Sequence, residues 1–393
     1  MSTQFVVMTA SSDETFREMV RDNLLNIPNA KVAAEYQEVS GNLYVRVLQD
    51  LERHPSAAVF IDLAGDTEQG LKSLERLKQA VPDLYIIASH YHADGETVIQ
   101  AMRSGANDFL TQPLKRAEFR EAIGRFERAP RRLATSESKL GKIYLFLGTR
   151  GGVGTTTLAV NFAGILAQRK QSVVAIDLDW TANDVAMQTG ATPQYTLAEV
   201  GENLARMDQA LFESFVTRDP LGFLLIGPAD DLERRGYFSD SMFREFATFL
   251  IEKYDSTVID GGKNINDEVI TGACQIATTI FLVVSQEFSS IRNAQRYLAM
   301  LMRAGCTQDQ IRVVVNRFQK KAGPAIADLE QIKRTLNQPV FYGIPDSPAF
   351  LTAINKGRPL VADRESAPEA DKSLRAFVDK ATKPQTAAAG AGQ

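Results

Sequence analysis

The apolar residues in the second half of the chain gather in short continuous runs, separated by segments long enough for a helix. Such runs are typical of strands that are buried on both faces of a parallel sheet, because helices cover each side. They are the strand that opens Tyr144–Ala159, and the runs Ser172–Asp179, Thr257–Gly262, Phe281–Ser285 and Val313–Phe318. This pattern predicts a parallel α/β sheet.

The first half shows the same alternation on a smaller scale. Phe5–Thr9, Ala57–Leu63 and Leu84–Ser89 are apolar runs of strand length, and Asp13–Leu25 has helical spacing. Ala101–Pro113 follows as a helix end, a glycine turn, a short strand and an Xaa-Pro step. The predicted fold class is therefore α/β, with two doubly wound parallel-sheet domains, the second larger than the first.

Polar stretches mark the boundaries between these regions. Residues 127–141, ERAPRRLATSESKLG, combine a proline with a basic pair and are predicted to be a linker. The linker separates a domain at 1–126 from a domain at 142–381. Residues 382–393, TKPQTAAAGAGQ, have low complexity, and we expect a disordered tail.

The strand, glycine-rich turn and helix of Tyr144–Ala159 have the layout of a phosphate-binding loop. Glycines let successive backbone N–H groups face an anion, and the helix adds its positive N-terminal end. The usual pattern is G-x-x-x-x-G-K-[ST]. Here Thr149 replaces the opening glycine and Thr155 replaces the lysine, while Thr156 keeps the hydroxyl. We therefore expect a nucleotide site with weakened catalytic power.

Polar side chains follow the other apolar strands at the points where those strands end. Asp177 and Asp179 end one run, Asp260 ends another, and Asn316 lies near the end of a third. Ligands of open α/β sheets bind beyond the carboxyl ends of the strands, so these side chains and the glycine loop are expected to converge. The competing interpretation is an α/β sheet without a nucleotide site.

Arg150–Thr157, RGGVGTTT, resembles the deviant Walker A motif of the MinD/ParA family, whose usual form is KGGVGKTT. The resemblance covers about residues 142–380 and implies an ATPase that binds ATP and Mg²⁺ and forms a homodimer sandwiched on nucleotide. It implies that Arg150 stands for the signature lysine that reaches into the partner's nucleotide, and that Thr156 and Asp260 hold the metal. Asp179 and Asp260 are the implied catalytic residues.

The same resemblance implies a larger set of nucleotide-binding residues. They are Arg150, Gly151, Gly152, Val153, Gly154, Thr155, Thr156, Thr157, Asp177, Asn316, Arg317, Pro345 and Asp346. Asn316 and Arg317 match the pair that flanks adenine in the family. Pro345 and Asp346, followed by the segment Leu351–Leu360, match its C-terminal adenine-side loop and helix.

Residues 3–126 resemble a response-regulator receiver domain, which implies a flavodoxin-type fold. Asp62 lies at the phosphoacceptor position and Ser89 at the hydroxyl position. The acidic pair that holds Mg²⁺ in receivers appears as Ser11 and Ser12, and the lysine before the late proline appears as Gln112. Phosphoryl transfer to a carboxylate needs such cations, so we expect Asp62 to be inactive as a phosphoacceptor.

The combination of a degenerate receiver with a MinD/ParA-like ATPase is similar to the TadZ/CpaE type of pilus assembly protein. That resemblance implies a localisation and assembly factor for a type IVb (Flp/Tad) pilus, with a pilus secretion ATPase or platform proteins as partners. Two other functions stay open: a ParA-type DNA-partitioning ATPase, and an ATPase that a receiver controls in a phosphorelay.

Composition adds limits to these predictions. The chain has 393 residues, of which 44% are hydrophobic and 23% charged, and its formal net charge is −4, so we expect no specific nucleic-acid partner. Its two cysteines, Cys274 and Cys306, lie in apolar helical contexts that favour buried packing in a reducing compartment. No run approaches ~18 apolar residues, and the N-terminus lacks the features of a signal peptide. We expect a cytoplasmic protein that reaches a cell pole or a membrane site through its partners.

Residues outside the strands allow three further predictions. Trp180, the single tryptophan, follows Asp179 directly, and we expect it either to be a packed loop residue or to face the dimer partner. Tyr237–Phe249 is predicted to be a helix that covers the sheet. Helix Lys372–Thr382, with Leu374, Phe377 and Val378 on one side, is also expected to pack on the sheet.

Overall fold

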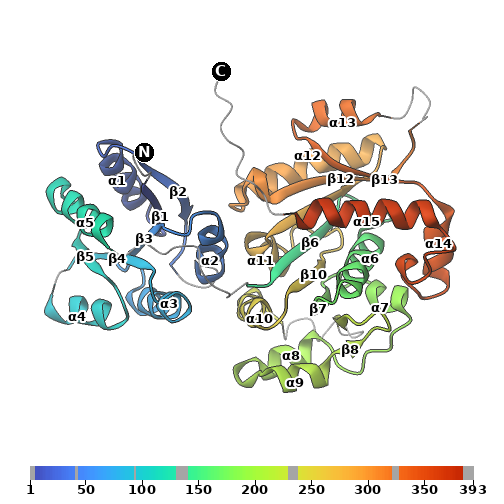
Figure 1. Ribbon diagram of the computed structural model, residues 1–393, viewed down its shortest axis with the longest axis horizontal. Coiled ribbons are helices and arrows are strands. Elements are labelled where there is room, and N and C mark those ends of the chain that lie inside the picture. Colours follow the sequence, from blue (N-terminus) through green and yellow to red (C-terminus); the bar gives the residue numbers. More distant parts are fainter. Residues whose placement is uncertain are drawn as a thin grey trace. The chain divides into compact units, whose positions relative to one another are not determined.

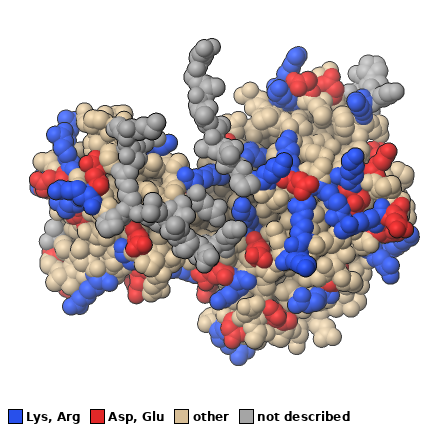
Figure 2. Space-filling view, in the orientation of Figure 1, with Lys and Arg blue, Asp and Glu red and all other residues tan. Residues whose placement is uncertain are grey.

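The computed structural model describes residues 5–39, 43–92, 94–129, 140–228, 238–320 and 327–383, without the side chain of Glu52. The chain divides into two compact units, 1–139 and 140–393, each built on a parallel sheet with helices on its faces (Figure 1), which confirms the predicted α/β fold class. Acidic and basic side chains both occur on the visible face of each unit (Figure 2), in keeping with the small net charge.

Among the described residues, the sheet of the first unit has five strands in the order β2-β1-β3-β4-β5, and all neighbours run parallel. This is the strand order of flavodoxin-like folds. The strands are β1 (Phe5–Ala10), β2 (Ala30–Tyr36), β3 (Ala58–Asp62), β4 (Tyr85–His90) and β5 (Asp108–Thr111). The sequence pattern did not reveal β2, because this edge strand is mostly half-buried and has no continuous apolar run.

Three helices of the first unit, α1, α3 and α4, begin where an aspartate side chain caps them. Asp13, Asp66 and Asp94 each accept a backbone N–H of the first turn, which satisfies a donor that has no partner within the helix. The helices are α1 (Glu14–Leu25), α2 (Leu43–Arg53), α3 (Thr67–Ala80), α4 (Gly95–Arg103) and α5 (Arg116–Arg128). Helix α5 enters the segment predicted as linker, and residues 130–139 of that linker lie outside the described residues.

The sheet of the second unit has the order β13-β12-β11-β6-β10-β7-β9-β8 within the described part of the chain, and only the short edge pair β8–β9 is antiparallel. Its strands are β6 (Lys142–Gly148), β7 (Val173–Asp177), β8 (Thr217–Arg218), β9 (Leu224–Ile226), β10 (Ser256–Asp260), β11 (Thr279–Val284), β12 (Ile311–Phe318) and β13 (Val340–Pro345). The five predicted strands are β6, β7, β10, β11 and β12, and they are direct neighbours in the middle of the sheet. Their carboxyl ends therefore form one continuous edge.

The helices that cover this sheet include the two predicted from aromatic and apolar spacing. They are α6 (Thr155–Gln168), α7 (Asp184–Thr189), α8 (Leu197–Asn203), α9 (Gln209–Phe215), α10 (Asp240–Lys253), α11 (Glu268–Ile276), α12 (Phe288–Arg303), α13 (Leu329–Leu336), α14 (Pro348–Asn355) and α15 (Pro368–Thr382). Short 3₁₀ turns lie at Leu204–Arg206, Gln308–Gln310 and Leu360–Ala362. Of the tail predicted at 382–393, residues from 384 onward lie outside the described residues.

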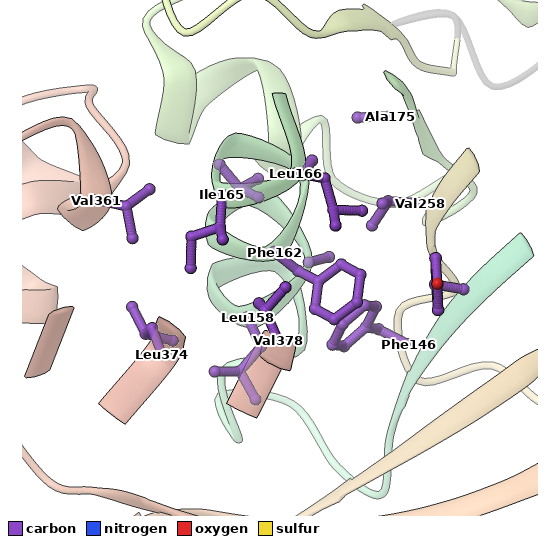
Figure 3. Packing of buried hydrophobic residues seen from close by; sticks show 14 of the residues in the cluster. Phe146, Leu158, Phe162, Ile165, Leu166, Ala175, Val258, Val361, Leu374 and Val378 are labelled. Atoms are coloured by element: carbon purple, nitrogen blue, oxygen red, sulfur yellow. The ribbon is translucent and has the colours of Figure 1, made fainter. Parts of the chain in front are cut away.

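The core of the second unit is centred on α6, which packs between the sheet and α15 (Figure 3). Phe162 lies in its middle, with ring centroids 4.9 Å from Tyr144, 5.4 Å from Phe146 and 5.7 Å from Phe377. Leu374, Phe377 and Val378 of α15 are buried in this core, as predicted. The phosphate-loop helix is therefore fixed rigidly, because it is packed on both sides.

Two further predictions about buried groups are confirmed. Phe243 and Phe246 of α10 are fully buried, so the predicted aromatic segment is a packed helix from Asp240 onward, while its first residue, Tyr237, lies outside the described residues. Cys274 and Cys306 are buried free thiols. Over the described residues, no helix combines the length and the apolar character needed to cross a membrane.

Candidate nucleotide site

The loop between β6 and α6 turns through two left-handed glycines. Gly152 has φ 77° and Gly154 has φ 91°, a region that residues with a side chain rarely adopt. Gly154 is also the place where the side chain of Asn316 approaches, and a Cβ there would collide with the Asn316 amide. The sequence Gly-Val-Gly is therefore required both by the backbone turn and by close packing behind the loop.

Helix α12 and the end of β11 hold the start of the loop. The Thr149 hydroxyl donates to the Val283 carbonyl at 3.0 Å and lies 2.7 Å from the Ser290 hydroxyl, while Asn293 donates to the Thr149 carbonyl at 3.0 Å. Thr149 is thus a structural anchor at the position where the common pattern has glycine. Sequence reasoning missed Ser290 and Asn293, because polar residues on a helix usually indicate only a solvated face.

Arg150 extends from the loop toward the start of α12. Its guanidinium forms an ion pair with Glu287 and donates to the Ser289 hydroxyl at 3.2 Å. The side chains are 41% exposed for Arg150 and 62% for Glu287, and exposed ion pairs of this kind contribute little to stability, about 0–1 kcal/mol. The arginine is therefore held in place weakly enough to be redirected by a stronger anion.

The consecutive threonines at the start of α6 take different directions. Thr155 is buried and its hydroxyl lies against Gly148, so the residue in the lysine position packs back on β6. Thr156 is half-buried and donates its hydroxyl to Asp260. Thr157 is buried, and its carbonyl accepts from Asn161 at 2.7 Å. Gly151 and Gly152 are exposed at the tip of the loop.

Asp177 and Asp260 are direct partners in the register of β7 and β10, and both are almost fully buried. Burial raises the pKa of Asp177 well above its usual range, and the neighbouring charge of Asp260 adds to the effect. Burial likewise raises the pKa of Asp260, to about 6. Two buried carboxylates side by side are costly to ionise together, so this position favours a nearby cation.

The two carboxylates are not equivalent in their contacts. Both oxygens of Asp177 accept backbone N–H groups, from Asp179 at 2.9 Å and Val185 at 3.1 Å, so this side chain shapes the turn into α7. Asp260 accepts from Gly262 N–H at 3.1 Å and from Thr156. Asp179 is half-buried and accepts from the backbone and the hydroxyl of Thr181.

The oxygen atoms around Asp260 fit Mg²⁺. Mg²⁺ in nucleotide sites is typically held by one or two carboxylates together with substrate phosphates. Thr156 and Asp260 offer a hydroxyl and a carboxylate at the foot of the loop. No group of three or more His, Cys, Asp or Glu side chains suited to a metal occurs among the described residues.

The residues matched to the adenine side lie at the ends of β12 and β13. Asn316 is buried and donates to the Val153 carbonyl at 2.8 Å, so its amide contacts the phosphate loop. Arg317 is exposed, with φ 52°. Pro345 ends β13, and Asp346 is exposed and accepts from Gln319 at 3.2 Å. These residues lie at the carboxyl edge of the sheet.

Trp180 is 8% exposed, and its ring lies 6.3 Å from that of Phe238. The structure thus favours the packed loop residue over the partner-facing residue, because so little of the side chain reaches the surface.

The receiver-like unit has its own carboxylate pocket. Asp62 ends β3 and is 2% exposed. One of its oxygens accepts from Gln112 at 2.7 Å and from the Ala64 N–H at 2.9 Å, and the other accepts from the Ser11 hydroxyl at 2.6 Å. Ser89 donates its hydroxyl to the Leu110 carbonyl at 2.8 Å. Both carboxylate oxygens of Asp62 therefore accept hydrogen bonds from neutral groups, whereas a phosphoacceptor aspartate must be open to the incoming phosphoryl group.

Comparison with known protein families agrees with this geometry. Residues 144–360 match the profile of the CobQ/CobB/MinD/ParA nucleotide binding domain, which is more than half of the chain. The chain belongs to this family. Residues 7–124 match the response regulator receiver domain, so the chain joins a receiver-like domain to a domain of the MinD/ParA type.

Individual relatives match more than half of the chain. The septum site-determining protein MinD of Thermotoga maritima is 26% identical over 226 residues, which are 56% of this chain and 81% of that protein. A ParA family ATPase of Chlorobium tepidum has the same fold, with a TM-score of 0.56 and 20% identity over 61% of this chain and 98% of its own. MinD of Pyrococcus horikoshii, complexed with Mg-ADP, has a TM-score of 0.54 and 19% identity over 62% of this chain and 97% of its own.

Proposed function

We propose that this protein is a nucleotide-gated dimeric scaffold that binds ATP with Mg²⁺ and hydrolyses it weakly or not at all. The observation that carries the proposal is the combination at the start of α6: a fully formed glycine loop and a Thr156–Asp260 pair, with Thr155 turned away at the lysine position. The Mg-ADP complex of the Pyrococcus horikoshii MinD supports an adenine nucleotide and Mg²⁺ as the ligands.

Slow hydrolysis follows from the charges available at the site. Stabilisation of developing phosphate charge is usually the largest catalytic contribution in phosphoryl transfer. Thr155 has no charge to offer, whereas the loop N–H groups and the α6 terminus still favour an anion. Binding therefore tolerates the loss of the lysine better than turnover does. Asp179 and Asp260 are the proposed catalytic residues for any remaining turnover.

Dimerisation is proposed to occur across the nucleotide face. A two-fold interface uses the same surface on both subunits, so Arg150 of each chain would face the phosphates bound by the other. Its present partner, Glu287, holds it only through an exposed ion pair, so a triphosphate is expected to compete successfully for it. The proposed interface comprises Thr149–Thr156, Asp179–Asn183 and Asp260–Asn264.

The receiver-like unit is proposed to be a docking domain. Asp62 is buried under Ser11 and Gln112, so the unit offers its shape and surface without phosphate chemistry. By resemblance to the TadZ/CpaE type, the protein would be a localisation and assembly factor for a type IVb (Flp/Tad) pilus or a related secretion system. Its partners would be a pilus secretion ATPase or platform proteins, at a cell pole or a membrane site.

A DNA-partitioning role receives less support. Lys and Arg side chains gather over α15 (Figure 2), but several are already engaged. Arg375 pairs with Asp371 at 2.8 Å, Arg169 pairs with Asp379 at 2.5 Å, and Lys380 donates to the Phe341 carbonyl at 2.7 Å. DNA binding that falls steeply with salt would favour the partitioning role over the scaffold.

The proposal is tested by titrating the purified protein with ATP in Mg²⁺ and measuring turnover in the same samples. We expect saturable binding and turnover far below that of a MinD/ParA relative that carries the loop lysine. The Asp260→Ala variant serves as the control for metal-dependent turnover. Robust turnover that this variant abolishes would overturn weak hydrolysis, and no binding of ATP would overturn the scaffold itself.

A further inference from the structure

The loop that follows β10 places a lysine beside the phosphate loop. The ammonium of Lys263 lies 3.8 Å from the position that a Cβ on Gly151 would take, and its Cδ lies 3.9 Å from the same point. Lys263 is exposed, and it forms no salt bridge with any carboxylate in the described part of the chain. An ammonium that pairs with no carboxylate of the described residues thus lies at the rim of a loop that has lost its own lysine.

This proximity is imposed by the backbone on both sides of Lys263. The Gly148 N–H donates to the Gly262 carbonyl at 2.7 Å, which joins the end of β6 directly to the loop after β10. The Tyr297 hydroxyl donates to the Lys263 carbonyl. One turn earlier on α12, Asn293 holds the phosphate loop through the Thr149 carbonyl at 3.0 Å. Helix α12 therefore sets the spacing between the phosphate loop and Lys263.

The electrostatics of the site call for a cation at this position. Asp177, Asp179 and Asp260 bring three carboxyl groups close to the loop, while Thr155 contributes no positive charge. The charge of Arg150 is directed toward Glu287 on the α12 side. An ammonium needs no fixed planar geometry to bind phosphate, so a flexible lysine can serve from a neighbouring loop.

We propose that Lys263 supplies, within the same chain, the phosphate-binding cation that Thr155 no longer supplies, and that it contacts the terminal phosphates of bound ATP. This inference rests on the proposed nucleotide site. It assigns to the loop after β10 a role in binding that the phosphate-loop sequence itself has lost.

The test compares ATP affinities in Mg²⁺ for wild type, Lys263→Gln and Lys263→Arg. Loss of a charge-assisted contact is expected to weaken binding about tenfold in Lys263→Gln, while Lys263→Arg stays near wild type. The matched control is Lys253→Gln, an exposed lysine at the end of α10, just before β10 and hence at the opposite edge of the sheet. It should bind ATP as wild type does.

A rescue experiment separates charge from loop structure. Adding Thr155→Lys to Lys263→Gln should recover the lost affinity, because it returns a cation to the same phosphates from the other side of the loop. Wild-type affinity in Lys263→Gln would overturn this inference and leave the nucleotide site standing. A loss that neither Lys263→Arg nor Thr155→Lys reverses would also overturn it, as a structural effect. Wild type that binds no ATP would overturn both.

Discussion

Asn316, near the end of β12, has two candidate roles: a contact with adenine and a brace for the phosphate loop. By its match to the family motif, its amide flanks adenine. In the structure the amide donates to the Val153 carbonyl at 2.8 Å and lies against Gly154, so it braces the phosphate loop. Asn316→Ala removes this donor and leaves a buried carbonyl unpaired.

The size of the effect follows from that single contact. An unpaired buried carbonyl costs about 1–3 kcal/mol. We expect the free variant to avoid most of this cost by loosening the phosphate loop. Nucleotide binding must then order the loop again, at a cost of about 1–2 kcal/mol, which lowers the affinity for phosphate about five- to thirtyfold. Because the defect lies in the phosphate loop, it should weaken the binding of inorganic triphosphate as much as the binding of ATP.

The assay is isothermal titration with Mg-ATP and, separately, with inorganic triphosphate in Mg²⁺. Arg317→Ala is the matched control, since Arg317 is the exposed neighbour on the adenine side. Arg317→Ala should affect only the affinity for ATP, if either, and should leave the affinity for inorganic triphosphate unchanged. If Asn316→Ala weakens ATP alone, the loop-bracing role is refuted and the adenine contact is favoured.

Four further outcomes are expected. Arg150→Glu should weaken the ATP-dependent dimer in sedimentation velocity, because it places a carboxylate at the proposed two-fold face; identical sedimentation of variant and wild type would show that the face is wrong. Thr155→Lys should raise ATP affinity in a filter-binding or titration assay, and an unchanged affinity would mean that the loop does not hold phosphate. Asp62→Ala should leave cellular localisation intact, and wild type should gain no mass from acetyl phosphate; diffuse but folded Asp62→Ala protein would restore the phosphorelay. Phe162→Ala should lower the free energy of unfolding by about 3–5 kcal/mol in chemical denaturation, since its ring fills the core around α6; a loss under about 1 kcal/mol would contradict that packing.

Strand ends were the part of the site that the sequence could predict. Each central strand is a continuous apolar run that stops at a polar residue, and parallel pairing then places Asp177 and Asp260 in register at one edge. The glycine loop could also be predicted from the sequence, because Gly152 and Gly154 adopt left-handed backbone conformations that favour glycine. The apolar residues of edge strand β2 are interrupted by Lys31 and Glu35, and β9 is only three residues long, so neither strand gives such a signal.

Contacts between distant segments could not be predicted from the sequence. Glu287 immediately precedes α12, and Asn293 and Tyr297 lie within it. Nothing in the spacing separates a residue that contacts the phosphate loop or its neighbouring loop from one that faces water. The sequence also presents Asp177 and Asp179 as similar residues. Only the packing shows that Asp177 is buried with both oxygens on backbone N–H groups, while Asp179 stays accessible.

The central claim is that ATP gates assembly of this protein. Sedimentation velocity of the full chain, without nucleotide, with Mg-ADP and with Mg-ATP, tests it most directly. We predict a shift from monomer to dimer that requires Mg-ATP and persists over the experiment, because hydrolysis is slow. An identical sedimentation coefficient in all three conditions, with ATP binding confirmed in the same samples, would contradict the account.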